Sequence, residues 1–93
     1  MKAVYKGVLL AESDHTVVVE GNHYFPPDSI NHDYLEDSDL TTTCPWKGKA
    51  SYFTINAGGE VSTNAAWIYP QPKEAAAEIK DYVAFYTSKV VVE

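Results

Sequence analysis

Cysteine is almost absent from this sequence, because Cys44 is the single thiol among 93 residues. One cysteine excludes an internal disulfide, and it also excludes a tetrathiolate zinc site built from two Cys-x-x-Cys knuckles. No apolar stretch approaches the roughly 20 residues of a membrane-spanning helix. The segment Met1–Lys6 carries charge and lacks the apolar run of a secretory signal. We therefore expect a cytoplasmic protein with no membrane partner.

Basic residues are scarce as well. Seven Lys and Arg face 13 Asp and Glu, which gives a net charge of −6. Nucleic-acid binding depends on neutralisation of phosphates by Lys and Arg, so we expect no nucleic-acid partner. The acidic residues concentrate in one stretch without Lys or Arg, which contains Asp28, Asp33, Glu36, Asp37 and Asp39. Such a run is typical of a solvated loop. A divalent-cation site is the alternative, but EF-hand spacing is missing, and we expect neither a metal nor a cofactor.

What the chain does contain is apolar and aromatic material, at 45% and 13% of its residues. This composition is that of a globular protein rather than a disordered one. No internal repeat, low-complexity tract or linker divides the chain. Its length suits one domain with one core, so we expect residues 1–93 to form a single domain.

Short β-branched runs dominate the first half of the chain. Val8–Ala11 and Thr16–Glu20 are separated by Ser13-Asp14-His15, which predicts a hairpin. His23–Phe25 is expected to form another strand, which ends at two prolines. A short helical turn is expected over Ile30–Leu35, and a strand over Thr41–Thr43.

The second half contains the strongest hairpin signal. Lys49–Ile55 and Val61–Tyr69 flank Asn56-Ala57-Gly58-Gly59, a turn sequence. Lys73–Lys80 has helix-forming composition, and the helix is expected to end near Lys80. Tyr82–Tyr86 is then expected to be a strand, although helical spacing would also allow the helix to continue to Tyr86. Val90–Val92 completes a mainly β fold: a compact curved antiparallel sheet, a small barrel or a β-tent-like domain, with one or two short helices.

Alternate side chains of a strand point to opposite faces, and this divides the predicted sheet into two unlike surfaces. One face is hydrocarbon and is expected to be the core; it holds Phe53, Ile55, Ala66, Ile68, Val83 and Phe85. The other holds amphipathic aromatics: Tyr52, Trp67, Tyr69, Tyr82 and Tyr86. This aromatic face is either a second packing layer, with its polar tips hydrogen-bonded, or the lining of a pocket.

The most distinctive segment is Cys44-Pro45-Trp46-Lys47-Gly48. A lysine beside a thiol favours the thiolate, which is how nucleophilic cysteines are activated. Lys47 is also suited to meet an anion. The alternative is that Cys44 fills space while Pro45 and Gly48 shape the start of a strand. A Cys–His pair would need a nearby base, and no spacing brings His15, His23 or His32 close to the thiol.

Three motifs in order carry a resemblance to a known family: the Cys44–Gly48 segment with Ala50-Ser51-Tyr52, then Ala66–Pro70 with Pro72, then Ile79-Lys80 with Val83–Tyr86. Together they resemble the domain of unknown function 427 family, over essentially the whole chain. The resemblance implies a compact β-rich, tent-like domain found mostly in bacteria, and it implies no particular activity.

That family is sometimes labelled nucleotidyltransferase-like, a label that the residues do not support. Nucleotidyl transfer needs paired carboxylates for Mg²⁺ and a Gly-rich or basic phosphate cradle. Asp37-Ser38-Asp39 has the carboxylate spacing but lies in the acidic stretch rather than on a convincing strand. We therefore set this activity aside.

Three functions remain open at the level of sequence. The first is binding of a small, anionic molecule at the aromatic face beside Lys47. The second is an enzyme in which Cys44 or Lys47 is the nucleophile or acid–base group. The third is a protein-interaction module. Under each of these functions we expect the chain to be a monomer or a weak homodimer. The predicted site is bordered by Cys44, Lys47, Tyr52, Trp67, Tyr69 and Tyr82.

Overall fold

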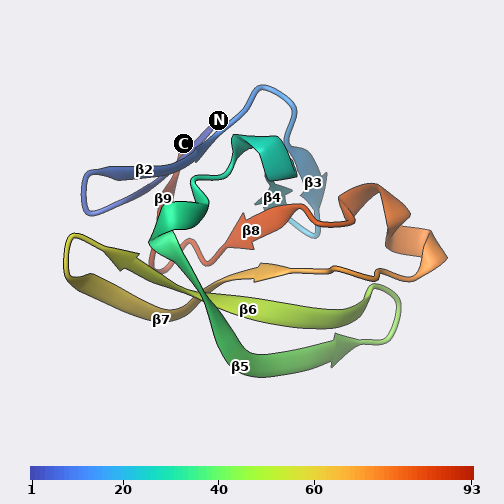
Figure 1. Ribbon diagram of the computed structural model, residues 1–93. Helices are drawn as coiled ribbons and strands as arrows, with labels where there is room; N and C mark the ends of the chain where they lie inside the picture. Colours follow the sequence, from blue (N-terminus) through green and yellow to red (C-terminus); the bar gives the residue numbers. More distant parts are fainter.

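Three antiparallel sheets make up the structure, a computed structural model that describes residues 1–93 (Figure 1). One sheet has the order β2-β1-β9, with β1 Lys2–Tyr5, β2 Val8–Glu12 and β9 Val91–Val92. A second pairs β3 Val17–Val19 with β4 Asn22–Tyr24. The largest has the order β5-β6-β7-β8, with β5 Leu35–Cys44, β6 Gly48–Ala57, β7 Glu60–Ile68 and β8 Val83–Phe85.

Helical structure is limited to three short 3₁₀ segments: η1 Pro27–Ser29, η2 His32–Tyr34 and η3 Glu74–Ile79. The predicted mainly β, antiparallel class with short helices is confirmed, and the open strand orders show that no sheet closes into a barrel. None of the helical segments is long or apolar enough to cross a membrane.

The hairpin predicted between Val8–Ala11 and Thr16–Glu20 is wrong. The strand β2 pairs with β1, and β3 pairs with β4. Lys6-Gly7 and Glu20-Gly21 form the two turns, with φ angles of 47° and 82° in the first and 53° and 79° in the second. Two consecutive positive φ angles match the twist of a two-residue hairpin. Only the second position of each turn is glycine, so the sequence signal is weaker than that of an Asn-Gly pair.

The predicted hairpin of the second half is confirmed. The strands β6 and β7 pair in antiparallel register around Gly58-Gly59, with Ala57 opposite Glu60 and Tyr52 opposite Trp67. The register shifts between Phe53 and Ile55. This irregularity inserts extra residues into β7, and it interrupts the simple alternation of faces there.

The acidic stretch is not the loop that its composition predicted. Glu36, Asp37 and Asp39 lie in β5, which pairs with β6 along most of its length, with an irregularity between Asp37 and Thr41. These side chains are exposed, so the strand places their charges in water at little cost. The strand predicted at Thr41–Thr43 is confirmed as part of β5, while the helical turn predicted over Ile30–Leu35 is limited to η2.

The predicted order at the C-terminal end, a short helix followed by a strand, is confirmed. The segment η3 has a kink at Ala76 and ends at Ile79, and β8 follows at Val83. The strand β9 then pairs with β1, so that Ala3 lies opposite Val92. Backbone hydrogen bonds of 2.6 and 2.9 Å between Lys2 and Glu93 extend this pairing, and the two termini lie side by side (Figure 1).

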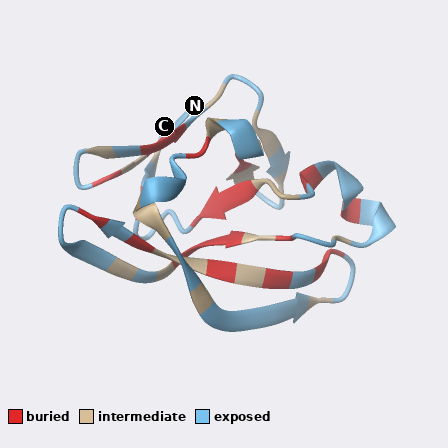
Figure 2. Ribbon diagram, in the orientation of Figure 1, coloured by how far each residue is buried: buried red, intermediate tan, exposed pale blue.

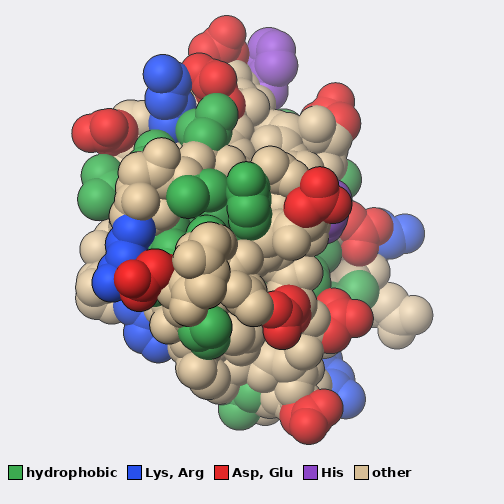
Figure 3. Space-filling view, turned by 60° about the vertical axis from the view of Figure 1, so that its left-hand side comes forward, with side chains coloured by type: hydrophobic (Ala, Val, Ile, Leu, Met, Phe, Trp, Pro, Cys, Tyr) green, Lys and Arg blue, Asp and Glu red, His purple; other side chains and the backbone are tan.

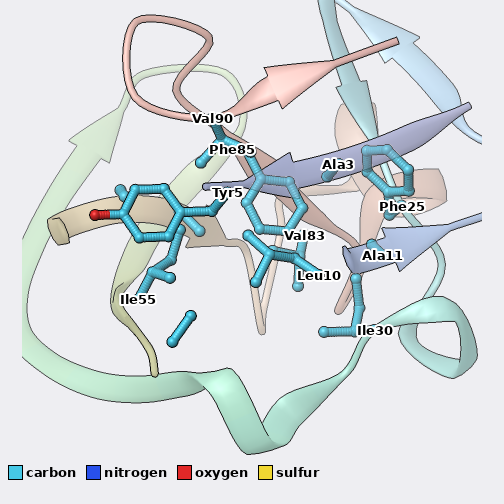
Figure 4. Packing of buried hydrophobic residues seen from close by; sticks show 13 residues of the cluster. Ala3, Tyr5, Leu10, Ala11, Phe25, Ile30, Ile55, Val83, Phe85 and Val90 are labelled. Carbon is cyan, nitrogen blue, oxygen red and sulfur yellow. The ribbon is translucent and has the colours of Figure 1, made fainter. Parts of the chain in front are cut away.

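The main core lies between the β2-β1-β9 sheet and the hydrocarbon face of the four-stranded sheet. Val83 and Phe85 are buried there with Ile55, as predicted, and Phe53 and Ile68 pack against them half-buried. Side chains from other elements complete this core and lie around Val83 and Phe85 in Figure 4: Tyr5, Leu10, Phe25, Ile30 and Val90. Ala65 also joins this core. Simple alternation from Trp67 would place it on the aromatic face, but the β7 irregularity shifts the alternation.

The opposite face of the four-stranded sheet is also buried. Its residues form a second cluster, here called the aromatic cluster, which contains Tyr24, Ala50, Tyr52, Trp67, Tyr69, Ala76, Ile79 and Ala84. Tyr24 comes from β4, and Ala76 and Ile79 come from η3, so these two elements cover the sheet (Figure 2). The aromatic face is therefore a second packing layer.

Candidate functional site

The Cys44–Gly48 segment forms the turn between β5 and β6, and a neighbouring segment holds it in place. The backbone N–H of Lys73 donates to the carbonyl of Lys47 at 2.9 Å, and Lys73 Nζ donates to the carbonyl of Pro45 at 2.7 Å. Gly48 has a φ of +111°, and a Cβ there would lie 3.4 Å from both Gln71 O and Lys73 N. Glycine thus allows both the backbone conformation and the close approach of the two segments.

Lys47 is the one charged residue that the fold buries, with 7% of its surface exposed. Its Nζ forms an ion pair with the carboxylate of Glu20, which lies in the β3–β4 turn and keeps 53% of its side chain exposed. The same Nζ lies 5.4 Å from the centroid of the Tyr69 ring and 5.5 Å from that of Trp46. These distances suit cation–π attraction, and the Trp46 ring remains 40% exposed.

The surroundings of Lys47 keep it charged. Burial by itself lowers the pKa of Lys47, but the hydrogen bond to Glu20 and the nearby phenol oxygens of Tyr24 and Tyr69 more than offset this, so its pKa is raised. The hydrogen bond from Lys47 lowers the pKa of Glu20 below its ordinary 4.5. Burial raises the pKa of Tyr69, and the charge of Lys47 only partly opposes it. The site therefore presents an ammonium ion, a carboxylate and a neutral phenol at neutral pH.

Beneath this site, the polar groups of Tyr24, Tyr52 and Trp67 in the aromatic cluster are hydrogen-bonded. Trp67 Nε1 donates to the hydroxyl of Tyr24 at 3.1 Å, and the two rings meet edge to face at 6.2 Å. The hydroxyl of Tyr52 lies 3.0 Å from Thr42 Oγ1 and accepts from Tyr86 at 3.4 Å. That hydrogen bond, together with burial, raises the pKa of Tyr86 to about 12. No buried side-chain nitrogen or oxygen lacks a partner.

A family model described as a domain of unknown function, DUF427, matches residues 1–93. The chain belongs to this family. The resemblance carried by the three sequence motifs is therefore confirmed. A search of curated proteins finds no match. In this DUF427 domain the first motif builds the β5–β6 turn, and the Ala66–Pro70 motif supplies Trp67 and Tyr69 to the cluster beneath it.

The structure brings some of the predicted site residues of this DUF427 domain together, but not on an open surface. Tyr69 lies beside Lys47, whereas Tyr52 and Trp67 are buried inside the aromatic cluster. Cys44 and Tyr82 are half-buried against the same cluster. Sequence reasoning missed two residues that complete the site, Glu20 and Tyr24. The only sequence signal at Glu20 is that it precedes Gly21 in a turn. This signal does not indicate that Glu20 pairs with Lys47.

The catalytic roles considered for Cys44 and Lys47 have no supporting contact. Cys44 makes no hydrogen bond to a histidine or to Lys47, and Lys47 is engaged by Glu20. Of the three histidines, His23 is hydrogen-bonded through Nδ1 to Thr16 Oγ1 at 3.0 Å. Asp37 and Asp39 lie on β5, and no three His, Cys, Asp or Glu side chains are grouped as metal ligands would be.

The one cavity of the DUF427 domain lies elsewhere. It has a volume of about 240 Å³ and is lined by seven residues: Leu9, Leu10, Ala11, Glu12, Asp28, Ser29 and Asn31. None of these residues belongs to the Lys47 site or to the aromatic cluster. The face shown in Figure 3 carries hydrophobic side chains near its middle with acidic side chains around them. Any ligand at Lys47 would therefore bind on a rim rather than in a deep pocket.

Proposed function

We propose that this domain binds a small anionic molecule with a flat apolar portion at the rim formed by Trp46 and Lys47. The observation that carries the proposal is the setting of the Lys47 ammonium. It is nearly buried, it lies near two aromatic rings, and its single anionic partner is the half-exposed carboxylate of Glu20.

A carboxylate or phosphate group of a ligand would take the place of Glu20. This exchange replaces one anionic partner of Lys47 with another, so the ammonium is never left buried and unpaired, which would be costly. The Glu20 side chain is already 53% exposed, so its carboxylate returns to water without any rearrangement of the core. The exposed ring of Trp46 offers a stacking surface for the flat portion of the ligand.

The two partners of the ion pair give this proposal a distinctive test. We would titrate the protein with indole-3-acetate, with benzoate and with inorganic phosphate, and follow tryptophan fluorescence and thermal shift. Lys47→Met keeps the apolar stem and should abolish binding of the aromatic carboxylates. Glu20→Gln removes the competing carboxylate and should tighten their binding by about tenfold, equivalent to about 1.4 kcal/mol. Lys49→Met, at an exposed lysine two residues away, is the matched control and should bind as wild type.

The opposite signs of the two effects separate binding from a purely structural ion pair. If Lys47 and Glu20 only stabilise the fold, both variants lose thermal stability and neither changes a ligand-induced shift. Equal weakening of binding in both variants would contradict the exchange of Glu20 for the ligand. Phosphate binding without aromatic carboxylate binding would remove the role given to Trp46.

A further inference from the structure

The long strand β5 is the outer strand of the four-stranded sheet, and its far side is free. Its partner is β6 alone, and beyond the bond from the Leu35 N–H to His32 O at the end of η2, no backbone–backbone hydrogen bond outside the sheet reaches this strand. In Figure 1 nothing lies beyond β5, and in Figure 2 most of this strand is exposed. Such an edge presents a row of unpaired N–H and C=O groups.

The other sheet edges are short or covered. Residues 60–64 of β7 extend beyond β8, and there Lys89 Nζ donates to the carbonyl of Thr63 at 2.8 Å. The edge of β8 is closed by reciprocal hydrogen bonds between Val83 and Phe25, at 2.8 and 2.9 Å. The edge of β2 is closed by Asn31, whose N–H donates to Leu10 at 2.8 Å, and by a bridge from Ala11 to Ile30. The strands β3 and β9 have only three and two residues. The edge of β5, with ten residues, is thus the one long edge left open.

The two halves of this edge differ in their chemistry. The first half carries Glu36, Asp37 and Asp39 and contains the irregularity before Thr41, two features that discourage strand pairing. The second half, Thr41–Cys44, has regular register with β6, exposed threonines, and no charge or proline. Threonine is well suited to strands, and cross-strand threonine pairs are favourable.

We infer that two copies of this chain pair through the Thr41–Cys44 edge of β5, antiparallel and centred on Thr42. A two-fold axis perpendicular to the sheet keeps the same face of both copies on one side, so the axis must pass midway between the two copies of one residue. Centred on Thr42, Thr41 faces Thr43 of the second copy, and Cys44 lies at the level of Leu40, where the irregular segment ends. The two four-stranded sheets join into one continuous sheet.

Charge and apolar surface favour a second copy in this register. A centre at Asp37 or Asp39 would place like carboxylates opposite one another, whereas the Thr42 centre sends the acidic halves outward. In this register Asp39 lies next to Pro45 of the second copy. Lys73 Nζ donates to the Pro45 carbonyl, so the carboxylate of one copy approaches an ammonium group of the other. The Leu40 side chain is 40% exposed in the single chain, and in the dimer it would lie against the second copy. The contact is small beside the roughly 1,200 Å² of a stable interface, so we expect a dissociation constant of order 100 µM.

The first test is the solution mass as a function of concentration. Sedimentation equilibrium of the wild type, from about 10 µM to about 1 mM, should show the mass rising from 10.3 kDa toward twice that value. Thr42→Lys places two ammonium groups on the two-fold axis and should hold the mass at that of one chain. Thr87→Lys makes the same change in an exposed turn outside β5 and should dimerise as wild type.

The second test reads the register and does not depend on how well Thr42→Lys folds. In a Cys44→Ser background, Thr42→Cys should form a disulfide-linked dimer on mild oxidation, because self-paired Cα atoms lie about 4.5–5.5 Å apart, within disulfide range. Thr87→Cys in the same background should cross-link at least tenfold more slowly. A wild-type mass that stays at one chain up to 1 mM, or equal cross-linking of the two variants, overturns the inference.

Discussion

Replacing Tyr24 by phenylalanine tests how the aromatic cluster is held together. The Tyr24 ring is fully buried and its hydroxyl accepts the 3.1 Å hydrogen bond from Trp67 Nε1, while Trp67 is itself buried. Tyr24→Phe removes one oxygen and leaves the ring in place. A lost hydrogen bond costs about 1 kcal/mol net, and a buried donor left without a partner costs about 1–3 kcal/mol. We therefore expect a loss of about 2 kcal/mol in the free energy of unfolding.

This loss is large for so small a domain. Stabilities of about 0.05–0.15 kcal/mol per residue mean that 2 kcal/mol is a substantial share of the total. Each kcal/mol shifts the melting temperature of a domain this size by roughly 4–8 °C, so Tyr24→Phe should lower it by about 8–16 °C. Urea unfolding followed by circular dichroism gives the free energy directly, since Tyr24→Phe leaves the backbone hydrogen bonds intact.

Two further variants decide whether the hydrogen bond is the cause. Tyr34→Phe is the matched control, because Tyr34 packs against the main core half-buried and its hydroxyl makes no hydrogen bond within the chain; its cost should stay within about 0.5 kcal/mol. Trp67→Phe should cost about 1 kcal/mol less in the Tyr24→Phe background than in the wild type. If Tyr24→Phe costs under about 0.5 kcal/mol, or the two changes add without coupling, the reasoning fails.

Three other predictions concern the core, the turn and the ion pair. Phe85→Ala should cost about 3–5 kcal/mol in urea titration, and a loss under about 1 kcal/mol would contradict its place at the centre of the main core. Gly48→Ala should cost about 2–3 kcal/mol, because it strains φ and crowds Gln71–Lys73, whereas Gly21→Ala meets open space and should cost about 1 kcal/mol. The lowered pKa of Glu20 means that its stabilising effect is present above its unfolded-state pKa and is lost as pH falls through the folded value. Wild-type stability should therefore fall more steeply than that of Lys47→Met between about pH 5 and pH 3, and parallel curves would show that the ion pair contributes nothing.

The β6–β7 hairpin and the two faces of its sheet could be predicted because local signals agree there. Gly58-Gly59 marks the turn, and the period of two places Tyr52 and Trp67 together on one side. The alternation fails at Ala65, where an irregularity of register breaks it. Such irregularities depend on how β7 pairs with both neighbours, and one strand's own sequence does not reveal them.

The first hairpins and the acidic strand were mispredicted for a different reason. In the turns Lys6-Gly7 and Glu20-Gly21 only one of the two residues is a typical turn residue. The polar sequence Ser13-Asp14-His15 is a stronger turn signal, so the sequence predicts the hairpin there. Glu36, Asp37 and Asp39 are poor strand formers in isolation, and they lie in a strand because β6 offers a long partner.

The candidate site was predicted in part. The sequence marks Cys44–Gly48 as its most distinctive segment, between strands predicted at Thr41–Thr43 and Lys49–Ile55, and the structure places the β5–β6 turn there. The partner of Lys47 was not found, because Glu20 lies 27 residues away and reaches it only through the placement of the β3–β4 hairpin over the sheet. The covering of the aromatic face by β4 and η3 is likewise a tertiary event that no strand pattern contains.

The pairing of β1 with β9 has a consequence for the order in which the chain folds. Ala3 and Val92 are neighbours in space but lie 89 positions apart in the chain. Closing a loop of that length costs about 4 kcal/mol, roughly twice the cost for ten residues. The β1–β9 pairing has only two paired positions and the two bonds between Lys2 and Glu93, which offset little of this loop-closure free energy. We therefore expect the contact to form after the local hairpins have brought both sheets together. The same contact should open first under stress, and the amides of Lys2 and Glu93 should exchange with solvent long before those of β6.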